Sequence, residues 1–107
     1  MKVQNLDKAK IIISGHQVDL GESFKHYAQS SLQQKSEKYW KNIIKTEVIV
    51  SKTSNQYKIE ITCNIGRMGQ FTSTSQHKDI YTAFNSACAK NTKQLRRMKR
   101  KVKDSHN

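Results

Sequence analysis

The chain has 107 residues, a formal net charge of +12 and a hydrophobic fraction of 35%. This size suits one domain with one sheet layer and one helix layer, so we predict a single domain over residues 1–107, with an ordered core at about 9–103. So large a positive charge favours an extended polyanion as partner, with nucleic acid ahead of an anionic membrane surface.

The cysteines and the N-terminal segment indicate the compartment. Cys63 and Cys88 form neither a CxxC motif nor a disulfide framework, so we expect both to be reduced and to act as small, buried apolar residues. Residues 1–13 lack the long apolar region of a signal peptide, and no apolar run approaches the roughly 18 residues of a membrane span. The sequence therefore predicts a cytoplasmic protein with no membrane partner.

The first half of the chain predicts a strand and then a helix. Lys10–Ser14 contains three consecutive isoleucines and stops at Gly15, which is typical of a short strand. A helix is expected from about Glu22 to Tyr39, with Asp19 or Gly21 as its N-terminal cap. Its apolar residues recur at helical spacing: Leu20, Phe24, Tyr27, Ala28, Leu32 and Tyr39.

Three strands follow. Glu47–Lys52 and Tyr57–Asn64 alternate apolar and polar residues, with a hairpin turn at Ser54–Gln56. A second turn at Gly66–Gly69 leads to Gln70–Ser75, whose many threonines and serines indicate an edge strand.

The last segment carries most of the positive charge. Its apolar residues fall within an arc of roughly 140° when each residue turns the helix by about 100°, and the basic residues fall mostly outside that arc. A disordered tail has no reason to keep this phase, so we predict one long helix from about Asp79. The arc contains Ile80, Ala83, Phe84, Ala87, Cys88, Asn91, Leu95, Met98 and Val102.

The element order is thus β-α-β-β-β-α, which predicts an α+β fold. The first two strands would be parallel neighbours joined by the first helix, and the last three would form an antiparallel meander. Because each strand has one apolar face, both helices must pack on the same face of the four-stranded mixed sheet. We therefore expect a two-layer sandwich whose opposite sheet face is polar and open.

Three segments resemble the ribosome hibernation-promoting factors, also called ribosome-associated inhibitors or sigma-54 modulation proteins. They are I-S-G-H-Q-V-D-L at Ile13–Leu20, the strand pair around Gly66, and D-I-Y-T-A-F at Asp79–Phe84 followed by K-N-T-K-Q-L-R-R-M-K-R-K. The resemblance covers about residues 11–103. The chain departs from the family pattern at Gly21, where threonine is usual, and at Asn85, where aspartate is frequent.

The resemblance implies a specific function. Family members bind the small ribosomal subunit in the channel used by messenger and transfer RNA, and they inhibit translation during stress or stationary phase. The chain resembles a short form, which would need a separate ribosome modulation factor to pair ribosomes or would hold single ribosomes idle. We expect a monomer when free, no cofactor and no enzymatic activity.

The same resemblance nominates the residues that contact 16S ribosomal RNA. They match the basic second helix of the family and one basic position on the first: Lys25, Lys90, Lys93, Arg96, Arg97, Lys99, Arg100, Lys101 and Lys103. Contacts of this kind with phosphates position a protein rather than specify a sequence. The competing explanation is a solvated helix face.

Other residues have weaker functional interpretations. Trp40 could stack on a base, although covering the core is the favoured role, and Tyr81 is expected to pack between helix and sheet. The four histidines and two cysteines show no metal-ligand spacing, and no nucleophile motif or phosphate loop is present. The alternative functions are a general binder of double-stranded RNA or DNA and, last, a basic membrane-surface or chaperone-like protein.

Overall fold

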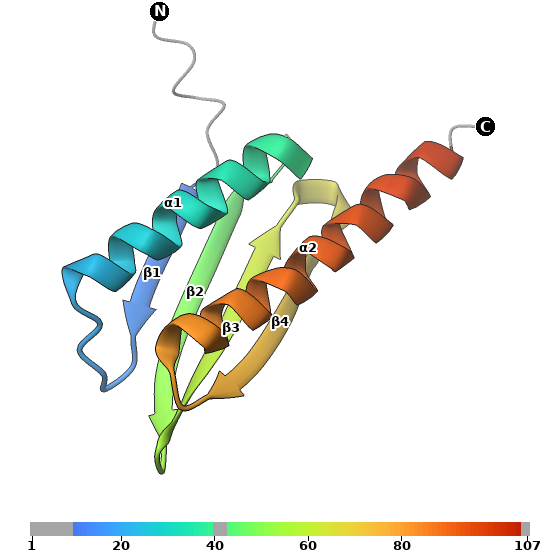
Figure 1. Cartoon of the computed structure of the whole chain (residues 1–107). Helices are drawn as coiled ribbons and strands as arrows, with labels where there is room; N and C mark the ends of the chain where they lie inside the picture. The colour runs from blue at the N-terminus through green and yellow to red at the C-terminus, as the bar shows by residue number, and fades with distance from the viewer. Residues whose placement is uncertain (1–9, 40–42, 106–107) are drawn as a thin grey trace, which may run out of the picture.

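The structure is a computed structural model that describes residues 10–39 and 43–105 (Figure 1). Trp40 lies outside these residues. In chain order the elements are β1 (Lys10–Gly15), α1 (Glu22–Tyr39), β2 (Lys45–Thr53), β3 (Gln56–Asn64), the short 3₁₀ helix η2 (Gly66–Met68), β4 (Gln70–His77) and α2 (Ile80–Ser105).

The sheet has the strand order β1-β2-β3-β4. β1 and β2 are parallel, with Ile13 opposite Val48, whereas β2–β3 and β3–β4 are antiparallel. Both helices cover the same face of the sheet and run in roughly the same direction (Figure 1). The predicted α+β fold is therefore confirmed, including the mixed sheet and the position of β4 as an edge strand.

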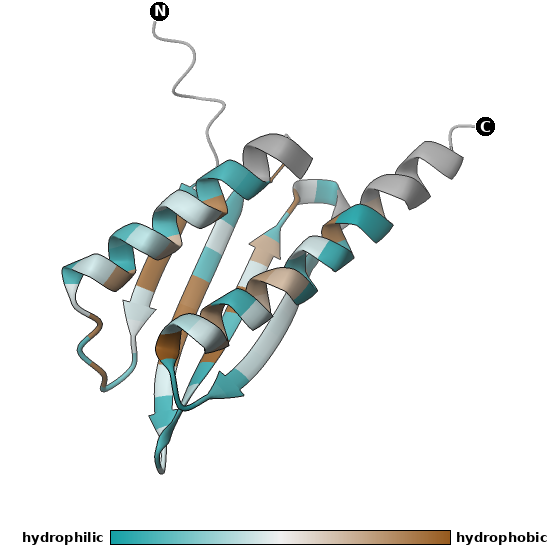
Figure 2. Ribbon diagram, in the orientation of Figure 1, coloured by the Kyte–Doolittle hydropathy of each residue, from teal (hydrophilic) through white to brown (hydrophobic). Residues whose placement is uncertain are grey.

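Alternation along the strands produces the two different faces of the sheet. Val48, Val50, Ile59 and Ile61 point toward the helices and are fully buried. Their neighbours point to the open face, where the Thr62 and Thr72 hydroxyls lie 2.8 Å apart on adjacent strands. Figure 2 shows the hydrophobic segments of the central strands beneath the helices. This burial fixes the register, because a one-residue slip would expose the whole apolar set.

Two glycines shape the connection from β1 to α1. A Cβ atom at Gly15 would collide with the carbonyl oxygen of Val18, so only glycine fits this close backbone approach. Gly21 has a φ of 78° and its carbonyl oxygen accepts the first helical hydrogen bond, from the Lys25 N–H at 3.3 Å. Gly21 is therefore the N-cap residue, and a left-handed backbone here favours glycine over the threonine usual in the family.

The N-terminus of α2 is fixed by an aspartate cap. The Asp79 carboxylate accepts hydrogen bonds from the Thr82 N–H at 2.9 Å and from the Thr82 hydroxyl at 2.8 Å. These hydrogen bonds, the backbone one first, hold the pKa of Asp79 below its usual value. The negative charge also complements the helix dipole, so the start of α2 is well defined.

Four aromatic rings join the two helices. Phe24 and Tyr27 of α1 meet Tyr81 and Phe84 of α2 edge to face, with ring centroids 5.1–5.8 Å apart. Tyr81 is 37% exposed. Our expectation that Tyr81 packs between helix and sheet is therefore wrong, because its ring contacts lie between the helices.

A chain of buried polar groups holds α2 on the sheet. The Cys63 thiol of β3 donates to Asn91 Oδ1 at 3.2 Å, and Asn91 Nδ2 donates to Ser73 Oγ of β4 at 3.4 Å. The Ser73 hydroxyl in turn donates to the Ala87 carbonyl at 3.1 Å. All of these hydrogen bonds form only when α2 has one particular rotation about its own axis. The network therefore fixes which face of α2 lies on the sheet and which face is exposed to solvent.

Candidate nucleic-acid interface

The phase of α2 separates its buried and charged residues as predicted. Ala83, Phe84, Ala87, Asn91 and Leu95 are buried against the sheet and α1. The four described basic side chains of the helix are all exposed, and we call them the basic face of α2: Lys90, Lys93, Arg96 and Arg97.

Lys90 of this face is anchored to the edge strand. Its Nζ donates to the Thr74 carbonyl oxygen of the edge strand at 2.8 Å. An ammonium group has three donors, so this contact leaves two for another acceptor. Lys90 thus covers part of the strand edge and also holds its charge beside β4.

The rest of the predicted basic set extends along the same helix. α2 continues to Ser105, and its C-terminal turns project past the end of the sheet (Figure 1). The side chains of Lys99, Arg100, Lys101 and Lys103 lie outside the described residues. The chain has no acidic residue between Asp79 and Asp104, so like charges such as Lys93 and Arg97 repel along the helix. A bound polyanion would turn this repulsion into attraction.

Lys25 does not join the basic face of α2. Tyr27 faces α2, since its ring contacts Tyr81 and Phe84. Lys25 lies two residues earlier, a rotation of about 200° around the helix, so it projects from the opposite flank of α1. The structure therefore separates Lys25, which is exposed, from the other predicted contact residues.

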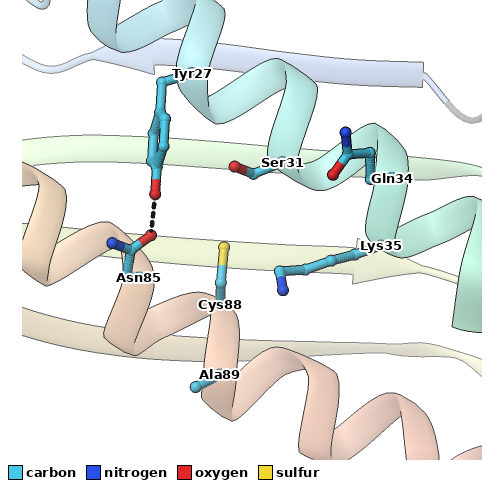
Figure 3. Close-up of a pocket in the computed structure, with 7 residues that line it drawn as sticks. All are labelled: Tyr27, Ser31, Gln34, Lys35, Asn85, Cys88 and Ala89. Atoms are coloured by element: carbon cyan, nitrogen blue, oxygen red, sulfur yellow. Dashed lines mark hydrogen bonds between the residues drawn. The ribbon is translucent and has the colours of Figure 1, made fainter.

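A pocket of about 240 Å³ lies between the two helices, and no motif in the sequence predicts it. In Figure 3 the Tyr27 ring stands at one end, Lys35 reaches across from α1, and Cys88 lies between them. The lining residues are Tyr27, Ser31, Gln34, Lys35, Asn85, Cys88 and Ala89. Positions 27, 31 and 34 recur at helical spacing along the border of the apolar stripe of α1, and this pattern is the sequence feature that could have indicated the pocket.

Both cysteines are free and buried. Burial is the main cause that raises the pKa of Cys63, and it raises the pKa of Cys88 to about 12 despite the opposing charge of Lys35. Cys63 is more than the apolar residue we expected, because its thiol belongs to the polar network of α2. Neither thiol is suited to nucleophilic chemistry, which requires an accessible thiolate.

We predict that both thiols resist chemical modification in the native protein. At pH 8 the folded chain should react with Ellman's reagent about a hundredfold or more slowly than the unfolded chain, because the reactive thiolate is disfavoured and shielded. The protein in guanidinium chloride is the control that shows full reactivity of both groups. Rapid reaction of either thiol without denaturant would contradict the buried positions of Cys63 and Cys88.

Within residues 10–39 and 43–105, no three histidine, cysteine, aspartate or glutamate side chains are grouped closely enough to hold a metal ion. Neither described helix combines the length and apolar character needed to cross a membrane.

Comparison with solved structures supports the fold. The N-terminal domain of Thermus thermophilus Protein Y superposes with a TM-score of 0.70 at 18% identity, covering 84% of this chain and 97% of that one. A ribosomal subunit interface protein from Coxiella burnetii gives a TM-score of 0.73 at 14% identity, with the same coverage. At these identities the likeness concerns the fold alone.

Sequence comparison adds relatives and a family. The chain is 27% identical over 95 residues to a ribosome hibernation promotion factor of Rhizobium meliloti (strain 1021), covering 89% of this chain but 50% of that protein. It is 26% identical over 92 residues to a ribosome hibernation promoting factor of Azotobacter vinelandii, covering 86% of this chain and 84% of that protein. The profile described as "Sigma 54 modulation protein / S30EA ribosomal protein" matches residues 11–103. The chain therefore belongs to the sigma 54 modulation protein / S30EA ribosomal protein family.

Proposed function

We propose that this protein binds the small ribosomal subunit in the decoding channel and inhibits translation by occupying the path of messenger and transfer RNA. The observation that carries the proposal is the basic face of α2, whose four side chains are all exposed. Family membership supports the ribosome as the partner. The surface fits an RNA-walled channel, since phosphate contacts from lysine and arginine supply most sequence-independent affinity.

Inhibition of this kind requires no catalysis. The folded domain has principal-axis extents of 48 × 34 × 18 Å, far wider than a single RNA strand. A body of this size in the channel excludes other occupants sterically. We propose that the protein acts in the cytoplasm, during stress or stationary phase, and that it binds 16S ribosomal RNA through Lys93, Arg96, Arg97 and the basic turns that follow.

The proposal predicts a strong dependence of binding on salt. With about six phosphate contacts, the association constant for small subunits should fall by roughly three orders of magnitude between 50 and 200 mM salt, because bound counterions are released on association. Cosedimentation through sucrose gradients over a salt series measures this slope. Failure to cosediment with small subunits at low salt would contradict the proposal.

The same gradients address the alternative function. A general binder of double-stranded RNA or DNA would bind arbitrary duplexes as tightly as it binds small subunits at equal salt. A ribosome-specific factor should favour the subunits, because the channel presents phosphates to the whole basic face at once. Gradients of whole ribosomes, with and without a ribosome modulation factor, would show whether pairing of ribosomes needs that second protein.

A further inference from the structure

The pocket between α1 and α2 has no role in the contacts proposed so far. Its volume of about 240 Å³ lies below the roughly 300–1,000 Å³ of pockets that enclose drug-sized ligands. A pocket of this size suits one flat group, such as a nucleobase, better than a whole nucleotide. Its position on the helical layer is also informative, because that layer carries the basic face of α2.

The lining supplies what an unstacked base requires. Recognition of single-stranded RNA commonly combines a stacking aromatic ring with hydrogen bonds to the base edge. Tyr27 is 37% exposed, and its ring stands at one end of the pocket (Figure 3). The Ser31 hydroxyl and Gln34 carboxamide can each donate and accept hydrogen bonds, and Lys35 adds a cation.

The pocket wall is held in place before any ligand binds. The Tyr27 hydroxyl donates to Asn85 Oδ1 across the helices at 2.7 Å, as Figure 3 shows. The Tyr27 ring also packs edge to face on Tyr81 and Phe84, with centroids 5.1 and 5.8 Å away. A ring fixed by a hydrogen bond and two neighbours loses little conformational entropy when a base stacks on it.

The pocket and the phosphate-binding side chains are in register along α2. Ala89 lines the pocket, and Lys93 and Arg96 follow it by one and two turns on the outward side of the helix. At 1.5 Å per residue they lie about 6 and 10 Å further along the helix axis. An RNA strand following α2 could therefore place one base in the pocket while its neighbouring phosphates meet these cations.

We propose that this pocket receives one unstacked base of a single-stranded RNA segment that runs along the basic face of α2. The inference rests on the proposed function, since it describes how that RNA is held. It differs from phosphate binding because it requires a base, so an anion without bases should lack this part of the affinity.

A pocket-filling substitution tests the proposal. Ala89→Leu adds bulk at an exposed helical position and changes no charge, and Gln29→Leu places the same side chain on α1 outside the pocket. The probes are a ten-nucleotide single-stranded RNA and inorganic polyphosphate of equal charge, titrated at low salt. We expect Ala89→Leu to weaken RNA binding about tenfold, the scale of one stacked base, and to leave polyphosphate binding unchanged.

Other outcomes would overturn the proposal. These are equal binding of RNA by Ala89→Leu and the unaltered protein, equal losses for RNA and polyphosphate, or the same RNA loss in Gln29→Leu. Binding of adenosine monophosphate as tight as that of the RNA would make the pocket a free-nucleotide site instead. Small-subunit cosedimentation by the same variants keeps the questions separate, because subunits can bind the basic face even if the pocket accepts no base.

Discussion

Reversing the charges of Lys93, Arg96 and Arg97 to glutamate is expected to abolish cosedimentation with small subunits. All three side chains are exposed on one side of α2. The logarithm of the association constant changes with the logarithm of the salt concentration by about 0.9 for each phosphate contact. Losing three contacts therefore lowers the association constant roughly 500-fold near 0.1 M salt, and repulsion between the new glutamates and the phosphates lowers it further. The fold should persist, because these side chains are exposed and point away from the core.

The open face of the sheet provides a matched control. Lys10, Lys45 and Lys58 lie on the three strands β1, β2 and β3, on the face away from the helices. Reversing all three also lowers the formal net charge from +12 to +6, but it spares α2. We expect this variant to bind small subunits with a much smaller loss. Equal losses in the two triple variants would mean that net charge, and not the basic face of α2, determines binding.

Replacing Asn91 with aspartate is expected to destabilise the protein by about 3 kcal/mol or more at neutral pH. Asn91 is 4% exposed, and its Nδ2 donates to Ser73 Oγ. The substitution keeps the shape of the side chain but replaces that donor with a carboxylate oxygen. No cation contacts Asn91 among the hydrogen bonds of the described residues, so the introduced charge would be buried without compensation.

The effect of Asn91→Asp should depend on pH in a definite direction. Burial raises the folded-state pKa of the introduced carboxyl above its unfolded value, which is about 3.9. The neutral form is then favoured in the folded state, so the destabilisation is smallest below the unfolded pKa and grows as pH rises. Denaturant unfolding at several pH values measures this trend.

Asn85→Asp is the control, because Asn85 is an exposed amide on the same helix. It should change the free energy of unfolding by only a few tenths of a kcal/mol. If Asn91→Asp were as stable as the original chain at neutral pH, the buried network between α2 and the sheet would be wrong, and with it the reason that the basic residues face outward.

Local patterns were sufficient to predict the elements and the phase of α2. Apolar residues alternate with polar ones in Tyr57–Asn64 and recur at helical spacing from Ile80 to Leu95, because in each element one side must be buried. The structure confirms that these apolar residues lie on the buried side. The start of α1 was predicted, but the choice between Asp19 and Gly21 as cap depended on a backbone angle, the φ of 78° at Gly21. Sequence periodicity does not contain that angle.

The candidate site was less predictable because it depends on how two helices pack. Lys25 and Tyr27 are only two residues apart, yet Lys25 lies on the far flank of α1 and Tyr27 faces α2. The pocket combines residues 27–35 with residues 85–89, whose proximity follows from the strand order and not from any local motif. Asn91 lies on the predicted apolar arc of α2, but its partners Cys63 and Ser73 come from the strands β3 and β4.

Displacement of labelled transfer RNA tests the central claim most directly. Small subunits carrying messenger RNA and a fluorescent transfer RNA would be titrated with the protein at low salt. If the protein occupies the decoding channel, the transfer RNA should be released, and the triple reversal of Lys93, Arg96 and Arg97 should fail to release it at the same concentrations. Simultaneous binding of the protein and transfer RNA to one subunit would contradict occupation of the channel.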